Sequence, residues 1–244
     1  MTNLICALAA TSFGFHSTLM HDSTVTPDPT PMPDEVKIED LRTGKGNAVQ
    51  PLDLVVVDYT GTLTNGKQFD SSRGRAPFSF RVGNGQVIKG WDTGLVGMKQ
   101  GGQRRLTVPP SLGYGAQDLG DIPPNSTLVF VIDLRKIQRA EIKTTTVGKG
   151  QAAGLGDTVT LHYRGKLANG KQFDASYDRN QPFSVTLGQG RVIPGFEQGL
   201  WQIKPGEKRT VTIPQELGYG ERGAGNVIPP KSKLIFEIEA LKVE

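Results

Sequence analysis

The sequence is poor in the side chains that build metal centres and covalent catalytic sites. Its 244 residues include one cysteine, Cys6, and three histidines, His16, His21 and His162. A single cysteine cannot form a disulfide within the chain, and three histidines supply little for a metal site or a Ser-His-Asp triad. No apolar run approaches the ~20 residues that a membrane-spanning helix needs. We therefore expect no metal, no cofactor and no transmembrane segment.

Charge and glycine motifs do not indicate nucleotide or nucleic-acid binding. The formal net charge is +4, and acidic residues are interspersed with basic ones, so we expect no nucleic-acid partner. Gly83-Asn-Gly85 and Gly188-Gln-Gly190 resemble phosphate-binding loops, but Ile88 and Ile193 occupy the place of the last glycine in that motif. We interpret both segments as turns that lead into a helix.

An internal repeat dominates what is present. The string Asn-Gly-Lys-Gln-Phe-Asp occurs at 65–70 and 169–174, Leu-Gly-Tyr-Gly at 112–115 and 217–220, and Ile-Pro-Pro at 122–124 and 228–230. The offset of about 105 residues is far longer than a solenoid repeat, so a whole small domain is duplicated. We place the first domain at 35–139 and the second at 140–244.

Residues 1–34 precede the repeat and differ from it in composition. Thr26-Pro-Asp-Pro-Thr-Pro-Met-Pro33 predicts a stiff proline-rich spacer. The mildly apolar residues 1–10 are compatible with a degenerate export signal or with an ordinary tail. The chain is exported, to a periplasm or outside the cell, if 1–10 are a truncated signal, and otherwise cytoplasmic.

The apolar residues follow two periods. In Val159-Thr-Leu-His-Tyr-Arg164 they alternate, which predicts a half-buried antiparallel strand with His162 on its solvent side. Trp91, Leu95 and Met98 share one helical face, as do Phe196, Leu200 and Ile203, which predicts one helix of about three turns in each copy. Several strands with one short helix indicate an α+β fold.

The spaced strings together resemble the FKBP-type peptidyl-prolyl cis-trans isomerases, the immunophilins. They are Val-Thr-Leu-His-Tyr163, Gly-Lys-Gln-Phe-Asp174, Val-Ile-Pro-Gly-Phe196, Leu-Gly-Tyr-Gly220, Val-Ile-Pro-Pro230 and Leu-Ile-Phe236, each with a counterpart in the first copy. The resemblance covers all but the first ~34 residues. It implies two tandem FKBP-like domains, each an antiparallel five- to six-stranded half-barrel wrapped around one short helix, with the binding pocket between sheet and helix.

Site residues are also implied by the resemblance, position by position. The residues expected to act directly on a substrate are Tyr59, Asp70, Ile88, Trp91 and Tyr114 in the first copy and Tyr163, Asp174, Ile193, Phe196 and Tyr219 in the second. The residues expected to bind it or support the pocket are Phe69, Arg75, Phe78, Val87, Ile122, Phe130, Phe173, Arg179, Phe183, Val192, Val227, Ile228 and Phe236. Ile88 and Ile193 are expected to act through the backbone N–H.

The resemblance implies isomerisation of X–Pro bonds in proline-containing peptides or unfolded protein clients, with macrolides as ligands of the same pockets. Such a reaction breaks no bond, so an apolar pocket that stabilises the twisted amide suffices. A non-catalytic peptide-binding or chaperone module would use the same pockets. On the residues alone, the aromatics are compatible with an ordinary core, and Asp70 and Asp174 with turn caps.

The first copy departs most from the pattern. It lacks one residue near Arg75, and it carries Asp121 where the second copy has Val227. A charge in a pocket wall weakens the binding of an apolar ligand, so we expect both domains to isomerise, with the second the stronger. The second copy has Phe196 where the family usually has tryptophan.

Overall fold

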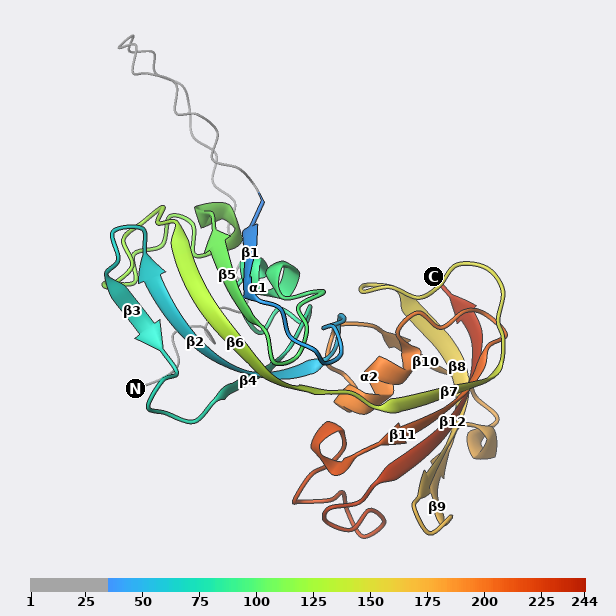
Figure 1. The fold of residues 1–244 in the computed structure, drawn as a ribbon. Helices are drawn as coiled ribbons and strands as arrows, with labels where there is room; N and C mark the ends of the chain where they lie inside the picture. Colours follow the sequence, from blue (N-terminus) through green and yellow to red (C-terminus); the bar gives the residue numbers. More distant parts are fainter. Residues whose placement is uncertain (1–34) are drawn as a thin grey trace.

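The computed structural model describes residues 35–244, which form two antiparallel sheets of six strands each. The two sheets follow one another along the chain, and each curls around one short helix (Figure 1). The α+β fold of two tandem half-barrels is therefore confirmed. The expected tail and proline-rich spacer lie outside the described residues.

The first sheet is centred on its two longest strands. β2 (Leu54–Leu63) pairs with β6 (Leu128–Gln138) along its whole length. The order across the sheet is β1-β5-β6-β2-β3, and β4 also pairs with β2. The remaining strands are β1 (Lys37–Arg42), β3 (Gln68–Ser71), β4 (Phe78–Arg81) and β5 (Gln103–Val108).

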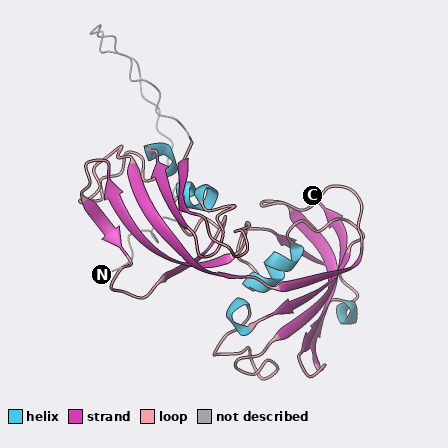
Figure 2. Ribbon diagram, in the orientation of Figure 1, coloured by secondary structure: helices cyan, strands magenta, loops and turns pink. Residues whose placement is uncertain are grey.

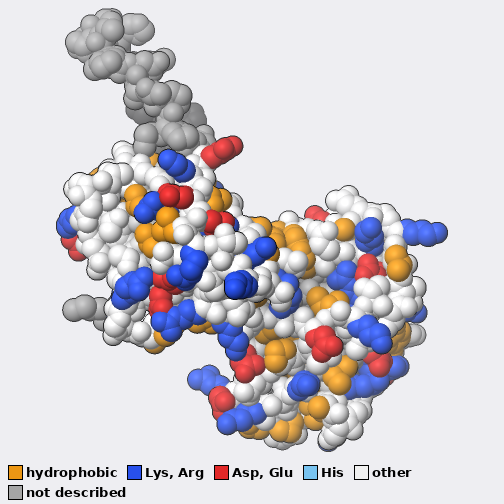
Figure 3. Space-filling view, viewed as in Figure 1, with side chains coloured by type: hydrophobic (Ala, Val, Ile, Leu, Met, Phe, Trp, Pro, Cys, Tyr) orange, Lys and Arg blue, Asp and Glu red, His pale blue; other side chains and the backbone are white. Residues whose placement is uncertain are grey.

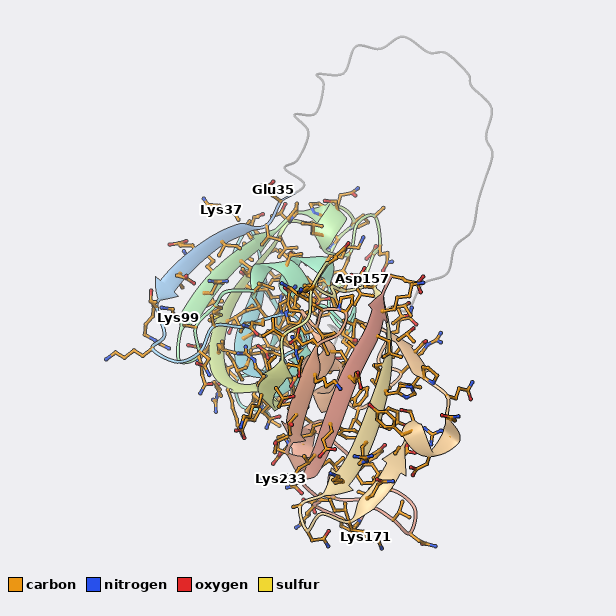
Figure 4. The ribbon with its side chains drawn as sticks, turned by 90° about the vertical axis from the view of Figure 1, so that its right-hand side faces the viewer. Glu35, Lys37, Lys99, Asp157, Lys171 and Lys233 are labelled. Atoms are coloured by element: carbon orange, nitrogen blue, oxygen red, sulfur yellow. The ribbon has the colours of Figure 1, made fainter. Side chains whose placement is uncertain are left out.

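The second sheet repeats this plan with β8 (Thr158–Leu167) and β12 (Leu234–Val243) at its centre. Its order is β10-β8-β12-β11-β7, and β9 also pairs with β8. The remaining strands are β7 (Glu141–Thr146), β9 (Gln172–Ala175), β10 (Phe183–Thr186) and β11 (Lys208–Ile213). Figure 4 shows Lys171, in the β8–β9 turn, and Lys233, before β12, at the end of this sheet opposite Asp157.

The alternating pattern places one face of each sheet in a core. In β8, Val159, Leu161 and Tyr163 are buried and their neighbours are partly exposed. His162 is therefore on the outer face as expected, but it is not free in solvent. It contacts the Ser176 hydroxyl at 2.9 Å and stacks on the Tyr177 ring at 4.5 Å between centroids.

The helices are shorter than the apolar stripes predicted. α1 spans Lys89–Gly94 and α2 spans Pro194–Leu200, so each has about two turns rather than three. Met98 and Ile203 are buried, but they lie in the turns that follow. Gly97, with φ of +79°, and Gln202, with φ of +59°, adopt left-handed backbone there and redirect the chain.

Glycines let each helix lie close against its sheet. A Cβ on Gly195 would come within 2.3 Å of Ile213, and one on Gly199 within 2.7 Å of Val211, both on β11. The first domain uses Gly90 and Gly94 against β5 in the same way. The floor of each half-barrel is thus fixed by backbone packed directly on strand side chains. Among residues 35–244, three single 3₁₀ turns complete the fold: η2 (Pro110–Leu112), η3 (Tyr177–Arg179) and η4 (Gln215–Leu217) (Figure 2).

The two domains are in direct contact. β6 and β7 form an almost continuous ribbon from one sheet to the other (Figure 1). The Gln198 side chain of α2 accepts a hydrogen bond from Ala140 N at 2.7 Å, and it donates to the carbonyls of Leu52 at 3.0 Å and Gln138 at 3.2 Å. Leu54 packs against the second core. The boundary that we place at 139/140 stays a prediction.

Charged side chains of both signs are spread over the surface. On the face shown in Figure 3, basic side chains lie beside acidic ones over both domains. Among residues 35–244, no helix is long and apolar enough to cross a membrane.

Candidate functional site

A cavity of about 390 Å³ opens between the second sheet and α2. Its size falls in the range of small-molecule and peptide side-chain sites. The residues that line it are Tyr163, Phe173, Asp174, Phe183, Arg191, Val192, Ile193, Phe196, Tyr219 and Phe236. They come from β8, β9, β10 and β12, from the loop that enters α2, from α2 itself and from the turn after η4. Segments distant in sequence therefore form one apolar site.

The base of the cavity is a cluster of perpendicular aromatic rings. Phe196 on α2 lies 5.0 Å from Phe236 and 5.7 Å from Tyr163 between ring centroids. Phe173 meets Phe236 at 5.5 Å. These edge-to-face contacts hold the rings in defined positions. Gly165 makes room for two of them, because a Cβ there would come within 2.7 Å of Phe173 and 2.9 Å of Phe236.

One carboxylate stands at the edge of this apolar surface. Asp174 accepts a short hydrogen bond from the Tyr163 hydroxyl and one of 2.5 Å from Arg179. Arg179 also donates to the Tyr163 oxygen at 2.9 Å. The Asp174 side chain remains 40% exposed. The three groups therefore form a fixed rim on one side of the cavity.

The carboxyl group of Asp174 and the phenol of Tyr163 keep their usual protonation states at neutral pH. Burial by itself raises the pKa of Asp174, but the hydrogen bonds from Tyr163 and Arg179 outweigh burial and bring the pKa below its usual 3.8. Burial and the hydrogen bond to Asp174 raise the pKa of Tyr163 above its usual 10.0. Asp174 is thus an anion and Tyr163 a hydrogen-bond donor across the neutral range.

Two hydrogen-bonding groups face this cavity without a partner of their own. Tyr219, after η4, is 41% exposed, and its hydroxyl makes no side-chain hydrogen bond within residues 35–244. The backbone N–H of Ile193, at the start of α2, donates to no group in the same part of the chain. An apolar site with a backbone donor and a phenol at its edge can hold a carbonyl group while its rings contact an apolar ring.

Most residues predicted for the second pocket line the cavity, and three do not. Arg179 touches the site only through Asp174 and Tyr163. Val227 is 50% exposed, because the loop that carries it turns outward, and Ile228 is 4% exposed in the core behind the lining. Arg191 lines the cavity and was missed. An exposed arginine in a turn carries no apolar or motif signal by which a sequence reveals such a role.

The first domain holds a matching tyrosine, aspartate and arginine in a similar arrangement, with Trp91 in the place of Phe196. Tyr59 donates to Asp70 at 2.5 Å, and Arg75 donates to the other Asp70 oxygen at 2.6 Å. Trp91 lies beneath, 5.1 Å from Tyr59 and 5.2 Å from Phe130 between centroids. Arg75 is thus the partner of Asp70 despite the missing residue nearby.

The first cluster is less exposed than the second. Phe78, Val87, Ile88, Tyr114 and Ile122 are between 1% and 9% exposed, against 41% for Tyr219. Phe69 meets Phe130 at 5.6 Å, as Phe173 meets Phe236. Asp121, expected in the pocket wall, is instead a surface residue that pairs with Lys67 at 2.9 Å, and Leu119 packs on the core in this loop.

A curled antiparallel sheet, a short helix with an aromatic residue in its first turn, and a carboxylate held by tyrosine and arginine together define an immunophilin-type half-barrel. The model of the FKBP-type peptidyl-prolyl cis-trans isomerases matches residues 45–135 and 149–241. The chain therefore belongs to that family and carries its domain twice.

Proteins with curated names agree with this membership. Human "Peptidyl-prolyl cis-trans isomerase FKBP10" is 41% identical over 201 residues, which cover 79% of this chain and 34% of the human one. A "FK506-binding protein" of Neisseria meningitidis is 55% identical over 96 residues, 39% of this chain and 88% of its own. A crystal structure of the three FKBP domains of wheat FKBP73 is 26% identical and covers 86% of this chain and 94% of its own, with a TM-score of 0.41. The matched region spans about a third of the length of the human relative.

Proposed function

We propose that the chain is a peptidyl-prolyl cis-trans isomerase that acts on X–Pro bonds in flexible or unfolded polypeptides, and that the cavity of the second domain is an active site. The observation that carries this proposal is the 390 Å³ apolar cavity whose rim holds an ionised carboxylate and whose helix entry presents an unpartnered N–H. The name of the human relative, a peptidyl-prolyl cis-trans isomerase, supports the same reaction.

The physical basis lies in the amide bond. Rotation about a peptide C–N bond costs ~18–20 kcal/mol of lost resonance, and X–Pro isomers interconvert in tens of seconds or more. The planar amide is more dipolar than the twisted one, so water favours the planar form. A dry, aromatic site removes that preference and stabilises the twisted state relative to the planar state.

Each cavity residue has a role in this scheme. The proline ring rests on Phe196, and the rings of Tyr163, Phe173 and Phe236 enclose it. The Ile193 N–H donates a hydrogen bond to the carbonyl that follows the proline, and the Tyr219 hydroxyl donates one to a second carbonyl. The Asp174 carboxylate lies beside the twisting amide carbonyl and opposes its planar dipole. Asp70, Ile88, Trp91 and Tyr114 take the corresponding roles in the first domain.

The proposal extends to ligands and clients. A macrolide fills the same apolar cavity and competes with peptide, in line with the name of the Neisseria relative. Clients are polypeptides that expose an X–Pro bond, whose proline ring fits the aromatic rings of the cavity.

Catalysis and mere peptide holding are separated by one set of variants. In the full chain, Asp70→Asn combined with Asp174→Asn removes both rim carboxylates but keeps their shape. We expect isomerisation of a proline tetrapeptide, followed by NMR exchange, to slow by about tenfold, the effect of one lost electrostatic contact worth ~1.4 kcal/mol in the transition state.

The control is Glu221→Gln, which breaks an exposed ion pair with Lys231 away from the cavity lining. It should leave the rate unchanged. A double variant with an unchanged rate contradicts the role given to the two carboxylates. A wild-type chain that suppresses aggregation without accelerating isomerisation contradicts the enzymatic proposal and favours a holding chaperone.

A further inference from the structure

The glycine turns of the two domains lie against each other. Gly83-Asn-Gly85 follows β4, and Gly188-Gln-Gly190 follows β10. A Cβ on Gly188 would stand 3.8 Å from the Gly83 carbonyl oxygen, and a Cβ on Gly190 would stand 3.6 Å from the Arg81 guanidinium. Each turn is followed, after one residue, by the Val-Ile pair at the start of a helix. The contact between the two turns therefore lies close in sequence to both candidate sites.

An acidic residue on each helix braces its own turn, but in different ways. In the first domain, Asp92 uses both oxygens on its turn, at 2.8 Å from Gly83 N and 3.1 Å from Gly85 N. The second domain has Glu197 at this place, directly after Phe196. Its Oε1 accepts from Gly188 N at 3.0 Å and from Gly190 N at 3.3 Å.

The extra methylene of Glu197 releases its second oxygen for the other domain. Oε2 accepts a hydrogen bond from Arg81 Nη2 at 2.5 Å. The pair is deeply buried, with side-chain exposures of 8% for Arg81 and 0% for Glu197. Arg81 also donates to Asn84 at 2.5 Å, which fixes the guanidinium from its own domain.

We propose that Arg81 of the first domain is a positioning residue of the second-domain site, acting through Glu197 on the turn that carries Arg191, Val192 and Ile193. The inference rests on the proposed function of that site. A buried carboxylate that loses its cation must gain a proton or move toward water. Either change weakens the bonds to Gly188 N and Gly190 N, and the Ile193 N–H then loses its fixed position.

The geometry separates this role from general stability. Asp53, which is buried, and Arg139, whose side chain is 27% exposed, form a second ion pair near the domain junction, at 2.5 Å and 2.7 Å, but neither residue bonds to the 188–190 turn. Arg139→Gln is therefore the control, since it removes a half-buried, ion-paired arginine near the junction without touching that turn.

The test uses the full-length, ¹⁵N-labelled chain and a proline tetrapeptide. Peptide titrations followed at the Ile193 and Ile88 amides give a Kd for each site separately. Arg81→Gln should raise the Kd reported by Ile193 about fivefold, with a smaller effect at Ile88. Arg81→Lys should restore part of the affinity. Arg139→Gln should leave the Ile193 Kd unchanged.

A second readout does not depend on the proposed function. Without peptide, the amide hydrogens of Gly188 and Gly190 should exchange faster in Arg81→Gln than in wild type, and at wild-type rates in Arg139→Gln. Unchanged exchange in Arg81→Gln overturns the inference even if the wild-type chain isomerises peptides. A wild-type chain that binds no peptide at Ile193 refutes the proposed function, while the exchange rates still decide the role of Arg81.

Discussion

Replacement of Gly165 by alanine should displace two aromatic rings of the second-domain cavity and weaken peptide binding there. Gly165 lies on β8, under the rings of Phe173 and Phe236, and Gly165→Ala adds only a methyl group. That Cβ would stand 2.7 Å from Phe173 and 2.9 Å from Phe236, where carbon atoms normally keep about 3.5–4.0 Å. Each ring must therefore shift by about 1 Å, and both rings line the cavity.

The expected magnitude follows from the crowding. Overpacking of this kind costs about 1–3 kcal/mol, so the free energy of unfolding in urea should fall by about 2 kcal/mol. Loss of peptide affinity at the Ile193 amide should be about tenfold, the equivalent of ~1.4 kcal/mol. Because Gly165 has no positive φ, the effect is one of space and not of backbone conformation.

Two matched glycines control the experiment. Gly61→Ala makes the same contacts with Phe69 and Phe130, at 2.7 Å and 2.9 Å, and it should affect the first-domain site alone. Gly154→Ala should have little effect, because its nearest neighbour, Asp157, would lie at 3.6 Å. Wild-type affinity and stability in Gly165→Ala would refute the reasoning that this glycine makes room for the cavity rings.

The ionised and interdomain groups lead to four further predictions. Isomerisation by the second domain should be independent of pH from about pH 5 to about pH 9, because the pKa of Asp174 is lowered and that of Tyr163 raised; a rate that titrates near neutrality would contradict this. Since the pKa of Asp174 is lower in the folded state, its stabilising effect is complete above the unfolded pKa and is lost as the pH falls through the folded value, which acid unfolding measures. Asp53→Asn should lower the free energy of unfolding by about 2 kcal/mol, because this 1% exposed carboxylate takes two bonds from Arg139, whereas Asp121→Asn at an exposed pair should change it by less than about 0.5 kcal/mol. Gln198→Ala removes its two hydrogen bonds to the first domain, to the carbonyls of Leu52 and Gln138, so ¹⁵N relaxation should show the two domains tumbling more independently, and an unchanged correlation time would argue against Gln198 as the connector.

The fold and the family could be predicted from the sequence because their signals are local and repeated. The alternation in residues 159–164 depends only on one strand having one buried face, and the structure has that strand. The apolar stripes predicted helices in the right places but made them too long. Met98 and Ile203 pack on the same cores from the turns beyond the helices, and periodicity does not distinguish a helical turn from a tight loop.

Contacts between the domains could not be predicted in the same way. From the sequence alone, Glu197 would be placed on the solvent-exposed side of a helix, and Arg81 on the outer face of a strand. Their burial exists only once the two domains are placed together. Arg191 was missed for a related reason, because an exposed turn residue lines the cavity through loop geometry that no short pattern encodes.

Helix α2 of the second domain carries two polar side chains, Glu197 and Gln198, on a surface that the first domain covers. In an isolated second domain this surface would be exposed to water. Transplanting that domain behind a different neighbour would leave Glu197 without its guanidinium and Gln198 without two of its three backbone partners, the carbonyls of Leu52 and Gln138. Chimeras and excised halves of this chain should therefore be built with residues 52, 81 and 138 carried along or with both helix residues changed. The second domain is therefore adapted to its neighbour in this chain and is not an independent module that can be moved unchanged.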